Sequence, residues 1–87
     1  MVTKNVTVKN EAGMHMRPAT AFAGEMGKFS SEVTLETMGK TLNAKSVMNI
    51  IAAGMKKGSV VTVTCEGTDE KAALSRAVEL LEGGLPE

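Results

Sequence analysis

Hydrophobic and polar residues alternate along four short stretches of the chain, and this period of two predicts four β-strands. The stretches are 2–8, 32–36, 40–43 and 60–65. In the last of them, the alternation puts Val61, Val63 and Cys65 on the same side of the strand. Cys65 is therefore expected to be a small, unreactive core residue, as single buried cysteines usually are.

Three other stretches have the spacing of amphipathic helices. The first helix is predicted to begin just after His15, because apolar residues then recur at i, i+3, i+4 and i+7. Its predicted buried positions are Ala19, Phe22, Ala23 and Met26. Ser46 is a typical N-cap residue and predicts a short helix over residues 47–53. The final helix is predicted to begin at Thr68–Glu70, with acidic residues in its first turn, and to end at Gly83.

The predicted elements follow the order β-α-β-β-α-β-α. Each strand has one polar face, so we expect a sheet that is open to solvent on one side and covered by helices on the other. The predicted fold class is therefore α+β, a two-layer open-faced sandwich. A chain of 87 residues suits one small core, and residues 1–87 are predicted to form a single domain.

Composition and charge argue against several classes of function. No apolar stretch has the length of a membrane-spanning helix, and the first ten residues lack the apolar core of a signal peptide, so we expect a cytoplasmic protein without membrane insertion. Residues 1–58 hold eight Lys or Arg and four acidic residues, whereas residues 59–87 hold two and six. This asymmetry is compatible with a basic face for an acidic partner or a phosphate, and equally with an ordinary solvated surface. No basic cluster is interleaved with aromatic residues, so direct nucleic-acid binding is not expected.

The only histidine of the chain, His15, lies in the stretch AGMHMRPAT at residues 12–20, where the first helix is predicted to begin. Unpaired amide groups and the helix dipole make such a helix start attractive to an anion. Arg17 adds a guanidinium that suits phosphate oxygens, and Pro18 is well tolerated in a first helical turn. The positive surroundings disfavour protonation of the imidazole, so we expect a neutral, nucleophilic ring. Together these features indicate a phosphoryl acceptor.

The residues alone leave a simpler interpretation open, in which His15 is an ordinary surface residue at a helix start. Metal binding is not predicted, because no second histidine or cysteine cluster is present. A hydrolytic triad is not predicted either, because no suitable serine and acidic residue accompany the histidine.

Two motifs resemble those of a known family. The stretch GMHMRPA at residues 13–19 is similar to the active-site signature of HPr, the histidine-containing phosphocarrier of the bacterial phosphoenolpyruvate-dependent sugar phosphotransferase system. The stretch NAKSVM at residues 43–48 is similar to the second signature of the family, and the separation of the motifs and the chain length also match. The resemblance implies a four-stranded antiparallel sheet covered on one face by three helices.

The same resemblance implies a relay function. His15 would accept a phosphoryl group on Nδ1 from phosphorylated enzyme I and pass it to sugar-specific IIA proteins or domains. Arg17 would steady the phosphate in both transfers. No cofactor and no metal would be needed.

Ser46 has a structural and a regulatory interpretation. As a helix N-cap it would contribute about 1 kcal/mol. In HPr of low-GC Gram-positive bacteria, the matching serine is phosphorylated by HPr kinase/phosphorylase, and the product is a corepressor for the catabolite control protein. Enteric members carry a serine here without that regulation, but Val47, Met48 and Ile51 resemble the regulated type more closely.

The resemblance also places the partner-binding surface. Met16, Thr20 and Gly24 would border His15 on the first helix, and Val47, Met48 and Ile51 would contribute from the second. At least one of the apolar residues of the second helix must pack inward, so Met48 is the expected exposed contact. Docking would be small and transient, and the chain is expected to be a monomer.

Three alternatives remain at this level. The regulatory branch of the family lacks the active-site histidine, so His15 argues against that assignment. A nitrogen-branch phosphocarrier shares the histidine signature and serves a different relay. The third alternative is an interaction module without phosphoryl transfer.

Overall fold

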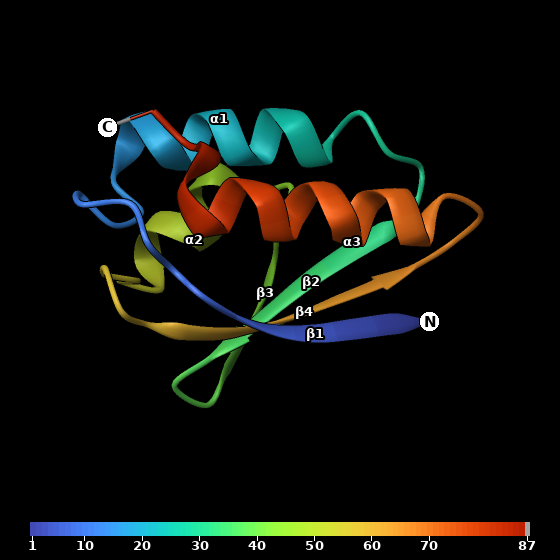
Figure 1. The fold of residues 1–87 in the computed structure, drawn as a ribbon, viewed down its shortest axis with the longest axis horizontal. Helices are drawn as coiled ribbons and strands as arrows, with labels where there is room; N and C mark the ends of the chain where they lie inside the picture. The colour runs from blue at the N-terminus through green and yellow to red at the C-terminus, as the bar shows by residue number, and fades with distance from the viewer. Residues whose placement is uncertain (87) are drawn as a thin grey trace.

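The computed structural model describes residues 1–86, which form a four-stranded antiparallel sheet with three helices against it (Figure 1). The strands are β1 (Val2–Thr7), β2 (Glu32–Thr37), β3 (Lys40–Asn43) and β4 (Val60–Glu66). Their order across the sheet is β1-β4-β2-β3, so β1 and β3 are the edges. All four strands predicted from the alternation are present, and the antiparallel sheet implied by the family resemblance is confirmed.

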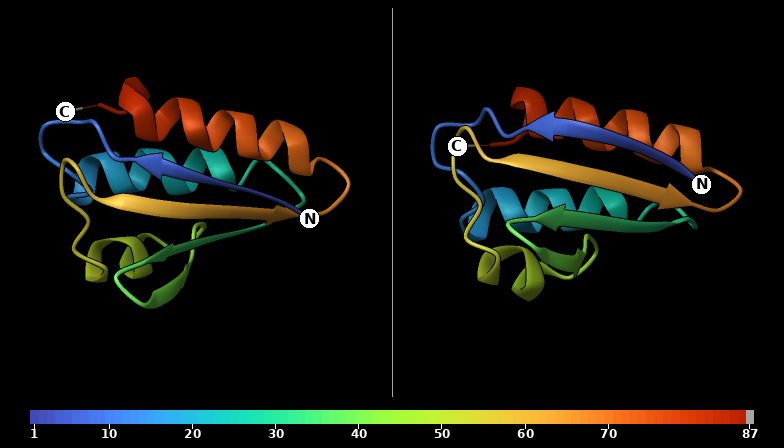
Figure 2. Two further views of the ribbon diagram at one scale, coloured as in Figure 1. Left: turned by 60° about the horizontal axis from the view of Figure 1, so that its bottom comes forward. Right: turned by 90° about the horizontal axis from the view of Figure 1, so that it is seen from below.

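The helices lie on the same face of the sheet, and the other face is open (Figures 1 and 2). They are α1 (Met16–Met26), α2 (Val47–Ala52) and α3 (Glu70–Glu79), and α3 continues into a single wide turn, η1 (Leu80–Gly84). Gly83 ends this turn with a φ of 126°, a conformation that glycine adopts readily. The predicted two-layer open-faced sandwich is confirmed.

The alternation of β4 explains which face of the sheet is covered. Val61, Val63 and Cys65 are fully buried under the helices, whereas Thr62 and Thr64 lie on the open face and are only half-buried. Burial raises the pKa of the Cys65 thiol, with smaller contributions from nearby carboxylates. The cysteine is thus a neutral core residue, as predicted.

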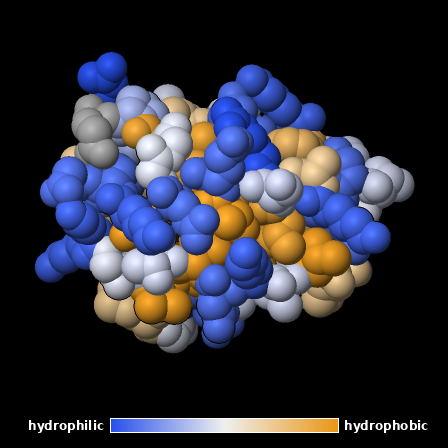
Figure 3. Space-filling model, viewed as in Figure 1, coloured by the Kyte–Doolittle hydropathy of each residue, from blue (hydrophilic) through white to orange (hydrophobic). Residues whose placement is uncertain are grey.

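The apolar sides of α1 and α3 pack toward the sheet. The four positions expected on α1 are all buried. On α3, Ala73 and Ala77 are fully buried, but Leu74 and Val78 are only half-buried because α3 overhangs the edge strand β1. Figure 3 shows the resulting apolar surface between α3 and β1, on the view of Figure 1.

Asp69 joins the start of α3 to the segment before β2. Its carboxylate accepts hydrogen bonds from the amides of Ser30 and Ser31, each 2.9 Å long, and from the Ser31 hydroxyl. These bonds, the Ser31 hydroxyl first, lower the pKa of Asp69 to about 2. These hydrogen bonds fix the start of α3 to the segment that connects the end of α1 to β2.

Acid is expected to weaken the fold through Asp69. Because the folded pKa lies below the unfolded value of about 3.9, the stabilisation is complete above about pH 4 and is lost as the pH falls through about 2. Asp69→Asn should have a lower free energy of unfolding at neutral pH. In this pH window, its free energy of unfolding should also change less with pH. Urea unfolding followed by circular dichroism between about pH 2 and pH 5 measures both, and parallel curves for the two proteins would contradict the assignment.

Candidate functional site

The loop that precedes α1 is held from two sides. The Asn10 carboxamide donates to the Gly13 carbonyl at 2.8 Å, and the Gly13 amide donates to the Asn10 carbonyl at 3.1 Å. On the other side, the Met14 amide donates to the Met55 carbonyl at 3.0 Å. Gly13 has a φ of 69°, and a Cβ there would lie 2.7 Å from the Met55 carbonyl oxygen. The chain therefore approaches the 55–56 segment closely, just before the histidine.

His15 is exposed and occupies the N-cap position of α1, as predicted. Its carbonyl accepts the first helical hydrogen bond, from the Ala19 amide at 2.9 Å, but its side chain caps no amide. The imidazole is thus free of structural hydrogen bonds within residues 1–86 and lies at the opening of the helix. Burial of the ring, which would have excluded a relay function, is not observed.

The opening of α1 offers donors to an anion. Within residues 1–86, the amides of Met16 and Arg17 have no acceptor, and Pro18 has no amide hydrogen to satisfy. The Arg17 side chain is exposed and forms no ion pair with any other described residue. Two amides and a helix dipole therefore lie beside His15, and the Arg17 side chain begins in the same helical turn, an arrangement that suits a phosphate.

The predicted docking residues of α1 share one exposed side. Met16, Thr20 and Gly24 follow one another at intervals of four residues, and all three are exposed. Met16 is 63% exposed, so its apolar side chain is accessible to a partner. The Thr20 hydroxyl donates to the Met16 carbonyl at 2.6 Å, so it is engaged with the helix backbone.

Ser46 caps α2, as predicted. Its hydroxyl oxygen accepts from the Asn49 amide at 3.3 Å and from the Asn49 carboxamide at 3.0 Å. Ile50 is the fully buried residue of α2, while Val47 and Ile51 are half-buried. Met48 is 69% exposed, as expected, and its role as a partner contact stays a prediction. The helix packs against α1, which places its surface beside that of α1.

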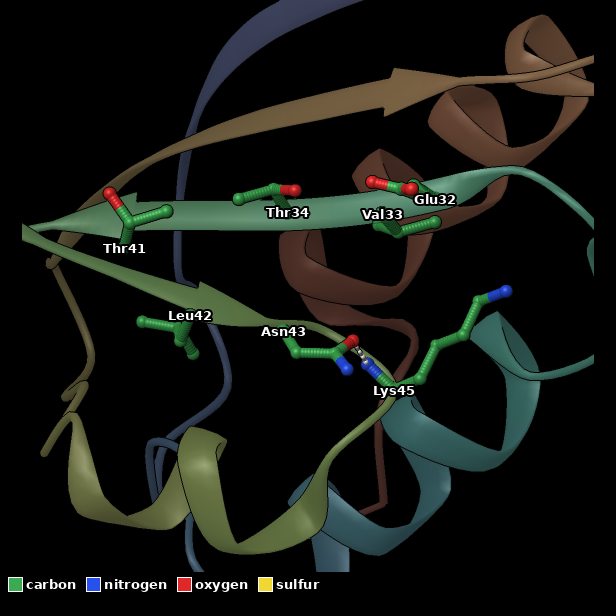
Figure 4. Close-up of a pocket in the computed structure, with 7 residues that line it drawn as sticks. All are labelled: Glu32, Val33, Thr34, Thr41, Leu42, Asn43 and Lys45. Carbon is green, nitrogen blue, oxygen red and sulfur yellow. Dashed lines mark hydrogen bonds between the residues drawn. The ribbon is translucent and has the colours of Figure 1, made fainter.

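Lys45 directly precedes Ser46 in the sequence, but its side chain does not extend toward the Ser46 hydroxyl. Its Nζ donates to the Phe29 carbonyl at 2.8 Å, so the side chain runs away from α2 (Figure 4). Its amide donates to the Asn43 side chain at 2.9 Å. The shallow hollow of about 460 Å³ beside it does not include His15. The hollow is lined by Glu32, Val33, Thr34, Thr41, Leu42, Asn43 and Lys45.

Two features of residues 1–86 bear on other functions. Across residues 1–86, no group of three or more His, Cys, Asp or Glu side chains is arranged to hold a metal ion. None of the helices in that range is both long enough and apolar enough to cross a membrane.

The fold and the site define a small open-faced sandwich that presents one exposed imidazole at a helix opening. A family model described as the PTS HPr component phosphorylation site matches residues 2–83. The chain is 39% identical over 82 residues to the HPr-like protein Crh of Halalkalibacterium halodurans, covering 94% of this chain and 98% of that protein.

Solved structures agree with this match. The phosphocarrier protein HPr from Bacillus anthracis superposes with a TM-score of 0.90 at 38% identity, covering 92% of this chain and 95% of that one. An HPr dimer from Thermoanaerobacter tengcongensis superposes with a TM-score of 0.77 at 40% identity, covering 94% of each chain. The chain belongs to the HPr family, and the resemblance of its two motifs is confirmed.

Proposed function

We propose that the protein is a phosphocarrier of the sugar phosphotransferase system. His15 Nδ1 attacks the phosphorus carried by phosphorylated enzyme I, a P–N bond forms, and the bond between phosphorus and its donor atom breaks. In the second transfer, an acceptor atom of a IIA protein or domain attacks the phosphorus, and the P–N bond to His15 breaks. The chain itself consumes no substrate and needs no metal or cofactor.

The exposed imidazole at the unoccupied amides of α1 is the observation that carries this proposal. The Met16 and Arg17 amides and the Arg17 guanidinium can all face the transferred phosphate oxygens. Because the two amides are fixed by the helix before the phosphate arrives, they need little reorganisation during transfer. The family assignment supports the same conclusion.

Incubation with phosphoenolpyruvate and enzyme I tests the proposal. We expect one added phosphate by mass spectrometry, and we expect it to be acid-labile and absent in His15→Ala. Because the His15 side chain is exposed and unbonded, the variant should fold normally, which circular dichroism checks. A chain that takes up no such phosphate would leave the nitrogen-branch phosphocarrier and the interaction module as the alternatives.

A regulatory module and a nitrogen-branch phosphocarrier would share this fold and would differ from the proposed function in the partner that they bind. The identity to the HPr-like protein Crh keeps a regulatory module in consideration, but the exposed His15 favours transfer. A nitrogen-branch phosphocarrier would accept phosphate from that branch's own first enzyme. Parallel assays with the first enzymes of the two branches distinguish these functions.

Ser46 is proposed to be a regulatory phosphorylation site. HPr kinase/phosphorylase would modify its hydroxyl, and the modified chain would bind the catabolite control protein. The position supports this proposal, because a phosphate at the N-cap of α2 is favoured by the helix dipole. An ATP-dependent, acid-stable phosphate that is lost in Ser46→Ala is the expected signature.

The docking surface is proposed to comprise the exposed side of α1 and the exposed and half-buried apolar residues of α2. Its residues are Met16, Thr20 and Gly24 on α1, and Val47, Met48 and Ile51 on α2. We propose further that the chain acts in the cytoplasm as a monomer, which leaves this surface accessible. An HPr dimer is known among the similar structures, so sedimentation analysis should accompany the transfer assays.

A further inference from the structure

We infer that Asn10 is a positioning residue for His15, because its buried carboxamide fixes the loop that carries the imidazole. This inference rests on the proposed phosphocarrier function. Asn10 does not touch the phosphate. It acts through the main chain at Gly13 and Met14.

Asn10 is anchored in the core. It is 1% exposed, and the two residues before it are tied to other elements by their backbone. The Val8 amide donates to the Ser59 carbonyl at 2.9 Å, and the Lys9 amide donates to the Leu81 carbonyl at 3.0 Å. From this fixed base, the side chain and main chain of Asn10 both bond to Gly13, at 2.8 and 3.1 Å. The turn 10–13 is therefore closed twice.

The carboxamide is held there at a cost. Its Oδ1 is buried and has no donor within residues 1–86. Turning the amide over would not help, because Oδ1 would then face the Gly13 carbonyl and that carbonyl would lose its donor. A buried polar group with one unmet atom is typical of a site where position matters more than stability. The useful half of this side chain is the Nδ2 donor.

The hydrogen bonds of Asn10 restrict the position of His15 through the main chain of Gly13 and Met14. Gly13 is held between Asn10 and the Met55 carbonyl, and the next amide, of Met14, donates to that same carbonyl. His15 follows directly, and its own side chain makes no hydrogen bond within the described chain that could fix it. The place of the imidazole relative to the Met16 and Arg17 amides thus depends on the main chain at 13 and 14. A misplacement of about 1 Å can slow a transfer about a hundredfold.

Asn10→Leu and Asn10→Ala test the inference. Leucine has nearly the same shape without polar atoms, so it removes both the donor and the unmet Oδ1. We expect Asn10→Leu to unfold at a somewhat lower urea concentration, because the buried Gly13 carbonyl loses its donor, and to accept phosphate at least about tenfold more slowly. In rapid-quench assays against phosphorylated enzyme I, the saturating rate should fall while the half-saturating concentration stays constant, because the docking surface is intact. Amide hydrogen exchange at Gly13 and Met14 should accelerate relative to β4.

Ser31→Ala is the matched control. Ser31 is also 1% exposed and also loses a side-chain hydrogen bond, to Asp69, but it lies beyond the opposite end of α1. It should lower stability without slowing transfer. Transfer at the wild-type rate in both Asn10 variants, or equal slowing in Ser31→Ala, would overturn the inference. Failure of the Asn10 variants to fold would also count against it, because a positioning residue leaves the core intact. If the wild-type chain accepts no phosphate, the proposed function fails, and the exchange data still decide whether Asn10 holds the loop.

Discussion

Gly13→Ala is expected to destabilise the protein by about 2–4 kcal/mol and to remove most of its phosphate acceptance. Two effects act at this position. The φ of 69° is unfavourable for any residue with a Cβ, and that Cβ would lie 2.7 Å from the Met55 carbonyl oxygen and 2.9 Å from Lys56 Cα. Both contacts are with backbone, so no side-chain rotation can relieve them. The loop must move away from the 55–56 segment, and His15 moves with it.

Gly54→Ala separates the two effects. Gly54 has nearly the same φ, 68°, but nothing lies within 4 Å of a Cβ built there. It should therefore show only the conformational penalty, about 1–2 kcal/mol, with normal transfer. Urea unfolding and the enzyme I assay on both variants give the comparison. Equal losses of stability in the two variants would mean that the close approach to Met55 contributes nothing.

The local elements were predictable because their signals repeat along the chain. The period of two in β4 correctly placed Val63 and Cys65 in the core, and the helical spacing correctly gave the buried side of α1. Ser46 was a predictable N-cap because its side chain bonds only three residues away. Signals of this kind need no knowledge of the rest of the fold.

The contacts that fix the site were not predictable in the same way. The sequence patterns leave residues 10–13 unassigned between a predicted strand and a predicted helix, whereas the structure shows a doubly closed turn held against Met55. The hydrogen bond from the Met14 amide to the Met55 carbonyl joins residues about forty positions apart, and no periodic pattern in the sequence predicts it. The side chain of Lys45 is a similar case, because its partner is a backbone carbonyl at Phe29 rather than a charge. The order of the strands was likewise not predicted, because alternation within one strand does not specify its neighbours in the sheet.

Phosphorylation of Ser46 is expected to slow phosphate uptake from enzyme I by about a hundredfold at low ionic strength. The modification adds a charge of about −2 at the N-cap of α2, a helix that packs against α1. The fold should survive, because phosphate oxygens can replace the hydroxyl as acceptors for the Asn49 amide and carboxamide. Lys45 is engaged at the Phe29 carbonyl and does not neutralise the new charge. The effect should therefore be repulsion of an acidic partner and not loss of structure.

Three variants and one titration distinguish these causes. Ser46→Asp should slow uptake in part, whereas Ser46→Ala should lose about 1 kcal/mol of stability from the missing cap and transfer normally. Ser75→Asp adds the same charge to the exposed side of α3, away from α1 and α2, and should leave uptake unchanged. Added salt should restore much of the rate in the phosphorylated chain, because screening weakens repulsion between exposed charges. If uptake by the phosphorylated chain is slow at every salt concentration, the phosphate obstructs docking sterically, and charge repulsion is the wrong explanation.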